Sequence, residues 1–259
     1  MNALRQFTDS HMTFPDHFST VSTQYAASRP HYPDELFAWL ATQAPARDLV
    51  WDAGCGSGQA SVALAAHFAR VIATDASAKQ LESAEQRANI TFHVAAEGNP
   101  SLADHSVDLV TVAQALHWFN REAFYREVER VLKPGGLLAV WTYDLLSVSP
   151  AIDAVVLPLY GDTLGAYWPP ERHHVETQYR EIGFPYALIE APPLAMRASW
   201  TRERFVGYLE TWSAVKEYRR LKAADPIALV RPALDSAWPD VGEREVCWPL
   251  TVLAGRPQR

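Results

Sequence analysis

Residues 49–58 read Leu-Val-Trp-Asp-Ala-Gly-Cys-Gly-Ser-Gly, and they are the most informative segment of the 259-residue chain. An apolar run ends in Asp52, and glycine then occupies positions 54, 56 and 58 before a helical pattern begins. Because glycine adopts φ > 0 and has no Cβ, such a turn brings bare backbone N–H groups close to a ligand. The segment therefore predicts a buried strand, a tight ligand-binding turn and a helix.

This turn differs from the dinucleotide-binding fingerprint. In G-x-G-x-x-G the third glycine stands one residue later, where this chain has Gln59. Asp52 precedes the loop, and a carboxylate there would repel a pyrophosphate but suits a positively charged ligand. An NAD-dependent oxidoreductase is therefore disfavoured, and a purely structural turn is the other alternative.

Apolar runs and helical patterns alternate through the middle of the chain. We expect strands at residues 48–53, 70–75, 90–96, 107–114 and 137–141 and helices at 34–44, 59–68, 78–88 and after the cap at Asn120. Ser77 and Gln80 form a capping box for the third of these helices. Strict alternation predicts a parallel sheet with helices on both faces.

The pattern changes after Tyr143, where prolines and aromatic residues become frequent. Helices are expected near 150–161, 174–182, 202–222 and 227–237, and strand-like runs at 185–195 and 245–254 would complete the sheet. The predicted fold is a Rossmann-like α/β domain, with a mostly parallel seven-stranded sheet and a helical C-terminal insertion. We divide this single domain (1–259) into an N-terminal arm (1–33), a core (34–143) and a substrate-side region (144–259).

The overall composition limits the function classes. A formal net charge of −7 argues against a nucleic-acid-binding protein. Cys55 and Cys247 provide neither a disulfide framework nor a zinc-binding spacing, so we expect no metal. No signal peptide or membrane-spanning run is visible, so a cytoplasmic protein with a small-molecule substrate is expected.

Several polar residues fall where the expected strands end. Asp52, Asp75, Ala96 and Gln114 all stand at predicted carboxyl ends, the edge at which open α/β sheets bind ligands. Asp75 suits a ribose, whose two hydroxyls a carboxylate can accept, although it could also be a helix cap. Glu97 could meet an adenine edge or remain solvated.

Residues 50–141 resemble the type 11 methyltransferase domain, a family of class I S-adenosylmethionine (SAM) methyltransferases. The resemblance covers Asp52-x-Gly-x-Gly-x-Gly58, Asp75, Ala96-Glu97, His117-Trp118-Phe119 and Arg130-Val-Leu-Lys-Pro-Gly-Gly136. The flanking motifs Tyr25-x-x-x-Arg29-Pro-x-Tyr-Pro33 and Tyr208-x-x-x-Trp212-Ser-Ala-x-Lys-x-Tyr218 resemble the trans-aconitate-methyltransferase-like subgroup, whose best-known members methylate small carboxylic acids.

The resemblance implies SAM as cofactor and a small-molecule acceptor, such as a carboxylic acid. It places SAM against Tyr25, Arg29, Asp52, Gly54, Gly56, Gly58, Asp75, Ala76, Ala96, Glu97 and Gln114, and the substrate against His117, Trp118, Trp212 and Tyr218. His117 is also the candidate catalytic residue. The alternative is a SAM-binding regulatory or partner protein without catalytic activity.

Three features have a second interpretation. His117 could act as a base, orient a substrate or be a structural histidine. The basic run from Lys216 to Lys222 is expected to be a solvated helix face rather than a site for an acidic substrate. The N-terminal arm is either a lid that closes over SAM through Tyr25 and Arg29 or a frayed terminus.

Overall fold

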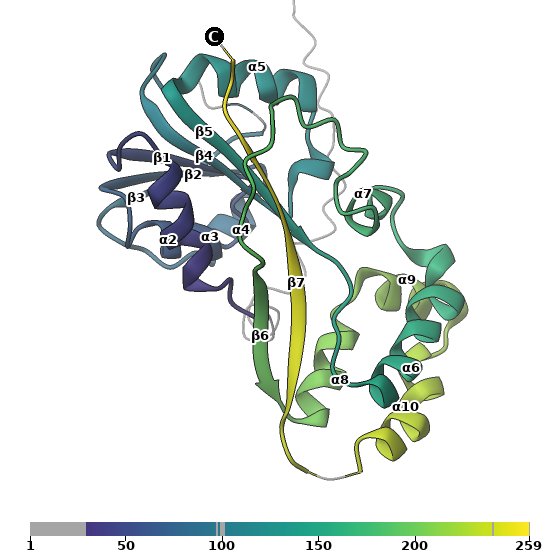
Figure 1. Ribbon diagram of the computed structural model, residues 1–259. Helices are drawn as coiled ribbons and strands as arrows, with labels where there is room; N and C mark the ends of the chain where they lie inside the picture. Colours follow the sequence, from purple (N-terminus) through teal and green to yellow (C-terminus); the bar gives the residue numbers. More distant parts are fainter. Residues whose placement is uncertain (1–29, 97, 99–101, 240, 259) are drawn as a thin grey trace, which may run out of the picture.

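The computed structural model describes residues 30–96, 98, 102–239 and 241–258, which form a seven-stranded sheet in the order β3-β2-β1-β4-β5-β7-β6 (Figure 1). Strands β1 to β5 are parallel, and β7 is antiparallel to both β5 and β6. The strands are β1 Leu49–Ala53, β2 Arg70–Asp75, β3 Ile90–Val94, β4 Val107–Ala113, β5 Leu132–Tyr143, β6 Ala195–Trp200 and β7 Arg244–Gly255. The predicted Rossmann-like α/β fold is confirmed.

Helices cover both faces of this sheet. The described helices are α2 Asp34–Gln43, α3 Gln59–Leu64, α4 Ala78–Glu82, α5 Arg121–Val131, α6 Pro150–Pro158, α7 Arg172–Glu176, α8 Arg202–Glu210, α9 Ser213–Lys222 and α10 Pro226–Ala237, with short helical turns η1 Leu116–Trp118, η2 Leu159–Thr163 and η3 Gly165–Tyr167. Leu36 of α2 and Leu64 of α3 belong to one hydrophobic core, whereas Phe124 and Val128 of α5 belong to another. Every residue of β1 is buried between these layers.

The predicted starts of α2, α3, α4 and α5 are confirmed, but α3 and α4 end earlier than predicted, and the helix predicted near 174–182 is the short α7. Ser77 and Asn120 cap α4 and α5 by accepting hydrogen bonds from the backbone amides of Gln80 and Ala123. Helix α4 ends at Glu82 because the Ser83 hydroxyl bonds the Gln80 carbonyl, a local contact that competes with helix continuation. Helix α3 ends at Leu64, and the amides of Ala66 and His67 then bond carbonyls three residues back, as in a tighter helical turn.

The predicted position of one of the last two strands is wrong. The run at 185–195 is not the strand that pairs along β7. It contributes one isolated bridge, between Leu188 and Gly255, and the paired strand is β6, which begins at Ala195. Pro192 and Pro193 explain the shift, since proline has no N–H for a sheet ladder.

Helices α6, α8, α9 and α10 gather beyond the carboxyl end of β5, and we call these four helices the cap (Figure 1). The single helix predicted over 202–222 is broken into α8 and α9. The Thr211 hydroxyl bonds the Tyr208 carbonyl, and Trp212 leaves helical geometry with ψ 133. Within the described ranges, no helix combines the length and apolar character of a membrane span.

A buried carboxylate holds the start of β1 in place. Asp108 on β4 has no exposed surface, and its Oδ2 accepts hydrogen bonds from the amides of Asp48 (2.9 Å) and Leu49 (3.0 Å). Its Oδ1 lies 2.7 Å from Lys133 Nζ on β5. Burial of a charge is costly unless it is paired and hydrogen-bonded, and here both conditions are met. One side chain thus ties three strands together at the end opposite the glycine loop.

Replacing this carboxylate should destabilise the fold. Asp108→Ala is expected to lower the free energy of unfolding by about 2–4 kcal/mol, because the buried Leu49 amide loses its acceptor. Urea denaturation measures the change. Asp48→Ala is the control, since that side chain is 71% exposed and its ion pair with Lys133 should contribute less than about 1 kcal/mol. Equal losses in the two variants would contradict this role of Asp108.

Candidate active site

The three glycines of the loop after β1 have different tasks. All three are left-handed, with φ of 66° at Gly54, 56° at Gly56 and 82° at Gly58. A Cβ at Gly54 would come within 2.7 Å of Ala115 Cβ, and one at Gly58 within 3.1 Å of the Phe92 ring. A Cβ at Gly56 would meet nothing within 4 Å. Gly54 and Gly58 therefore allow close packing, whereas Gly56 exposes backbone to open space.

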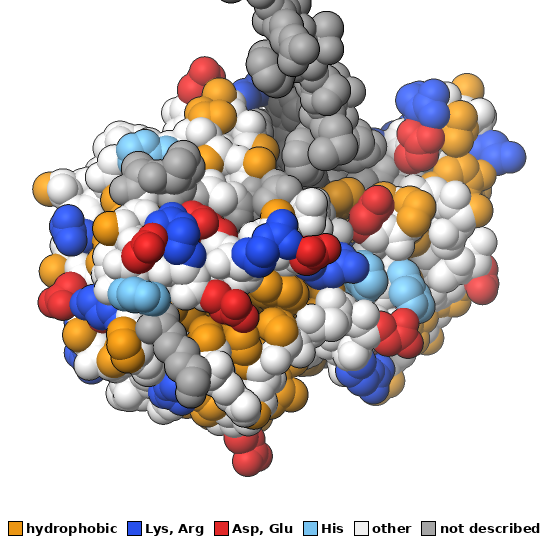
Figure 2. Space-filling model, turned by 90° about the horizontal axis from the view of Figure 1, so that it is seen from above, with side chains coloured by type: hydrophobic (Ala, Val, Ile, Leu, Met, Phe, Trp, Pro, Cys, Tyr) orange, Lys and Arg blue, Asp and Glu red, His pale blue; other side chains and the backbone are white. Residues whose placement is uncertain are grey.

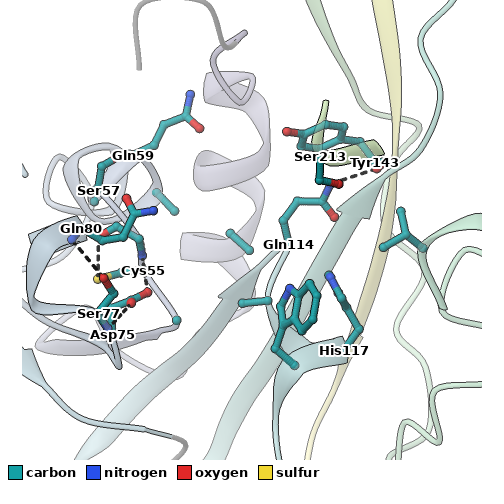
Figure 3. A pocket seen from close by; sticks show the side chains of 18 of the residues that line it. Cys55, Ser57, Gln59, Asp75, Ser77, Gln80, Gln114, His117, Tyr143 and Ser213 are labelled. Carbon is teal, nitrogen blue, oxygen red and sulfur yellow. Dashed lines mark hydrogen bonds between the residues drawn. The ribbon is translucent and has the colours of Figure 1, made fainter. Parts of the chain in front are cut away.

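That space is a cavity of about 860 Å³ at the carboxyl ends of the parallel strands. The core contributes the glycine loop, Asp75 and Ala76 after β2, Ala96 after β3, and Gln114 after β4. Figure 3 shows Asp75, Ser77 and Gln80 on one side and Gln114, His117 and Tyr143 on the other. His31, Tyr32 and the region from Asp144 onward also contribute to the wall, so the cavity lies between the core and the cap.

Asp75 fastens the glycine loop to the end of β2. Its Oδ2 accepts a hydrogen bond from the Gly56 amide at 2.8 Å, and its Oδ1 accepts one from the Ser77 amide at 2.8 Å. Burial raises the pKa of Asp75, while these two amides act in the opposite direction. Each carboxylate oxygen keeps a further lone pair for a ligand hydroxyl.

Asp52 lies beneath the loop, outside the set of residues that form the cavity wall. It has no exposed surface, and its carboxylate accepts hydrogen bonds from Ser61 Oγ (2.5 Å) and Thr111 Oγ1 (2.9 Å). Burial raises the pKa of Asp52 to about 6, although the two hydroxyls lower it. A ligand in the cavity would therefore interact with the charge of Asp52 across the loop, without direct contact.

The end of β4 is held in an unusual backbone conformation. Gln114 has φ 54°, which is rare for a residue with a side chain. Its Nε2 donates to the Tyr143 carbonyl at 2.9 Å (Figure 3). Its Oε1 accepts a short hydrogen bond from the Thr142 hydroxyl. These contacts fix Gln114 against β5, and the residues that follow enter the cavity wall.

His117 borders the cavity and is uncharged. Its Nδ1 lies 2.7 Å from the hydroxyl of Tyr179, a residue that is 1% exposed. Burial, followed by the charges of Arg172 and His174, lowers the pKa of His117 to about 3. The side chain therefore remains neutral throughout the physiological pH range.

A partly buried cation, Arg172, forms part of the wall opposite the glycine loop. The guanidinium of Arg172 donates to Asp144 Oδ1 (3.0 Å) and to the Tyr160 hydroxyl (2.9 Å). It also lies over the rings of Tyr160 and Trp168, at 5.5 Å and 5.1 Å from their centroids. Arg172 is thus held in place by four contacts at the edge of the cavity.

The basic run on α9 was predicted to be a solvated helix face, and this holds for only part of it. Arg219 and Arg220 do pair on the surface with Asp225 and Glu217. Lys216, however, lines the cavity together with Tyr208 and Trp212. These three residues are spaced four apart in the sequence motif that ends at Tyr218, and this spacing was the signal for a shared face.

Most of the site residues predicted from the sequence come together at this cavity. Its wall contains Gly54, Gly56, Gly58, Asp75, Ala76, Ala96, Gln114, His117, Trp118 and Trp212. Tyr218 is outside the wall, and its ring packs against that of Tyr167 with the two centroids 5.0 Å apart. Tyr25, Arg29 and Glu97 lie outside the described residues, as does most of the proposed arm. The sequence offered no comparable signal for Arg172, Asp144 or Tyr179.

Comparison with known proteins identifies similar chains. A family model described as a methyltransferase domain matches residues 51–140. A protein of Dictyostelium discoideum named as a methyltransferase is 34% identical over 229 residues, 87% of each chain. The 27-O-demethylrifamycin SV methyltransferase of Amycolatopsis mediterranei is 32% identical over 184 residues, covering 66% of this chain and 68% of the relative.

A solved structure extends this likeness to the three-dimensional fold. The structure, from Anaeromyxobacter dehalogenans and named as a type II methyltransferase, has a TM-score of 0.84 and 46% sequence identity. The match covers 88% of this chain and 97% of that one. The similarity therefore includes the cap as well as the sheet.

Removing the Asp75 carboxylate tests the ribose assignment. Asp75→Ala should weaken SAM binding by about 2–4 kcal/mol, because charge-assisted hydrogen bonds are lost. Titration calorimetry with demethylated SAM and with an analogue lacking both ribose hydroxyls separates ribose contact from loop support. The penalty should shrink for the analogue. An equal penalty for both ligands would assign Asp75 to the loop alone.

Asp52→Asn should have opposite effects on stability and binding. Burial raises the pKa of Asp52 from 3.8 to about 6, so the folded protein loses stability as the pH rises between these values, and the full loss is present at neutral pH. The variant should be more stable at neutral pH by on the order of 1–3 kcal/mol, measured by urea denaturation.

Binding of SAM should weaken in Asp52→Asn more than binding of its demethylated product, which lacks the sulfonium charge. In the unmodified protein the same preference for SAM should fall as the pH drops through about 6, as Asp52 becomes protonated. A variant with unchanged stability and unchanged ligand preference would contradict this electrostatic role.

Proposed function

The chain belongs to the class I SAM-dependent methyltransferases, and we propose that it methylates a carboxylate of a small organic acid. The product would be a methyl ester, together with demethylated SAM. The observation that carries the choice of acceptor is Arg172, a cation fixed at the cavity wall close enough to His117 to lower the pKa of that residue. A substrate in the trans-aconitate-methyltransferase-like subgroup would have this chemistry.

The residues around the glycine loop fit SAM. Gly56 leaves open space where a Cβ would stand, and Asp75 presents carboxylate oxygens beside it. Ala76 and Ala96 offer small side chains at the adjacent strand ends. We assign the nucleoside to these positions and the methionine part to the side nearer Gln114. When bound, SAM supplies the electrophilic methyl group on its sulfonium.

The wall beyond Gln114 favours an anionic acceptor over an amine. Arg172, Lys216 and Asp144 all border the cavity there. An ammonium ion is best recognised by aromatic faces, but the Tyr160 and Trp168 rings already hold Arg172. An acid could instead approach the cations directly, and Arg172 suits a carboxylate geometrically.

The protein's own groups need only position such an acceptor. A carboxylate is ionised at neutral pH, so no base has to remove a proton. His117 is neutral and is a poor proton acceptor, since its pKa is lowered to about 3. We assign it, with Trp118 and Trp212, to substrate orientation. The aromatic wall of Trp168, Tyr208 and Trp212 would exclude water from the reacting atoms.

Other parts of the sequence interpretation stay predictions. They include the cytoplasmic location, the absence of nucleic-acid partners and the division into arm, core and substrate-side region. The face in Figure 2 carries basic and acidic side chains close together, which is compatible with a small-molecule substrate. SAM binding without catalysis remains the alternative, and it predicts no methyl transfer to any acid.

The acceptor can be tested with SAM carrying a labelled methyl group. We expect label transfer to members of a panel of mono-, di- and tricarboxylic acids, but not to the matching amides. Mild base should release the label as methanol, because esters hydrolyse and ethers do not. A base-stable product would assign a different acceptor atom, and no transfer to any acid would contradict the proposal.

The fork of Arg172 provides a second test. Arg172→Lys keeps the charge but loses the bidentate geometry, so the KM for the acid should rise about tenfold or more. The affinity for SAM should change by less than about twofold. Arg180→Lys, an exposed change in the same segment, is the matched control. An unchanged KM in Arg172→Lys would remove this residue from the acceptor site.

A further inference from the structure

The Tyr179 side chain is placed to control the state of His117. It follows α7 with φ 59°, a rare conformation for an aromatic residue, and its ring is almost fully buried. Its hydroxyl meets the Nδ1 atom of His117 at 2.7 Å. His117 lies in η1, after β4, and Tyr179 follows α7. The contact therefore joins two segments that are far apart in the sequence.

The direction of this hydrogen bond follows from its surroundings. The Tyr143 carbonyl can only accept, so it receives Gln114 Nε2 and leaves Gln114 Oε1 facing Thr142. Thr142 gives its one proton to that oxygen. The Thr142 side chain is also within hydrogen-bond reach of the Tyr179 hydroxyl, but it has no second proton to donate to it.

The Tyr179 hydroxyl must therefore be the donor in a hydrogen bond of its own. Burial raises the pKa of Tyr179, so the phenol remains a donor at neutral pH. Imidazole nitrogen is a better acceptor than a hydroxyl, and 2.7 Å is the usual length for an O–H donor and short for an N–H donor. The phenol thus donates to Nδ1, and the proton of the neutral imidazole lies on Nε2.

We propose that Tyr179 is a positioning residue that fixes His117 as an Nε2–H donor toward the acceptor carboxylate. This inference rests on the proposed function, because it assigns His117 a ligand of that chemistry. His117 then recognises the acid through a hydrogen bond and does not act as a base. Arg172 attracts the carboxylate by its charge, while the hydrogen bond from His117 orients it.

The charges around His117 support this role. The groups that lower its pKa after burial are Arg172 and His174, both on α7. Asp144, at the end of β5, is paired with Arg172. Because the pKa of His174 is itself lowered, the charge that opposes an imidazolium here is that of Arg172, and the neutral ring remains as a donor for an anion.

The tautomer can be observed without any substrate. Nitrogen-15 NMR of protein labelled at histidine, with His117→Gln used to assign the signal, should find the proton on Nε2. The signal should not titrate between about pH 6 and about pH 8.5. Tyr179→Phe should shift it toward a mixture of tautomers. Tyr186→Phe is the matched control, because it removes a buried hydroxyl that has no hydrogen-bond partner among the residues that the structure describes.

Kinetics provide the second readout. Tyr179→Phe should raise the KM for the acid about five- to tenfold, with a smaller change in kcat, because one oriented hydrogen bond is lost. Gln at 117 keeps an amide donor near the Nε2 position, so His117→Gln should lower activity but leave enough to measure a KM. In that background Tyr179→Phe should change KM by less than about twofold, since Tyr179 then has no imidazole to orient.

A proton found on Nδ1 of His117 would overturn the inference, as would equal effects of Tyr179→Phe in both backgrounds. A sigmoidal loss of kcat below about pH 7 that disappears in His117→Gln would show a base and would also overturn it. Failure of the acid panel with the proton on Nε2 would instead reject the proposed acceptor and leave the tautomer assignment standing.

Discussion

Two hydrogen bonds pin the glycine loop to the end of β2, from the Cys55 amide to the Thr74 carbonyl at 2.9 Å and from the Gly56 amide to Asp75 at 2.8 Å. They hold Gly56 in a left-handed conformation with its missing side chain facing the cavity. Any Cβ there would enter the ligand space and strain the backbone. The rest of the site is arranged around this bare segment.

The cavity has two sides that differ in origin and chemistry. The core side consists of strand ends, small residues and carboxylates, which suit a cationic ligand that carries a ribose. The other side carries the cations Arg172 and Lys216 and a neutral His117. A donor and an acceptor of opposite charge would therefore meet between β4 and the cap. Buried Asp52 indicates that part of the fold's stability is given up for this arrangement.

The core could be predicted because its signals are local. The apolar runs of β1, β2 and β4, the caps at Ser77 and Asn120, and the acid at Asp75 each follow from adjacent residues. The cap could be predicted only coarsely. Proline positions moved β6 to Ala195, and one predicted helix divides near Trp212.

The missed site residues depend on tertiary contacts. Arg172 and Tyr179 belong to an irregular segment, and each gains its role from a distant partner: Asp144 for Arg172 and His117 for Tyr179. No local spacing records such pairings. Lys216 could have been found, because it stands four residues after Trp212, one helical turn further along the predicted helix. Treating the whole basic run as one solvated face concealed it.

A crystal structure with demethylated SAM bound would test the central claim most directly. We expect the ribose hydroxyls on Asp75, the ligand passing beside Gly56, and the sulfur facing the space bounded by His117, Arg172 and Lys216. A ligand bound elsewhere, or a sulfur that faces away from those three side chains, would contradict the two-sided site.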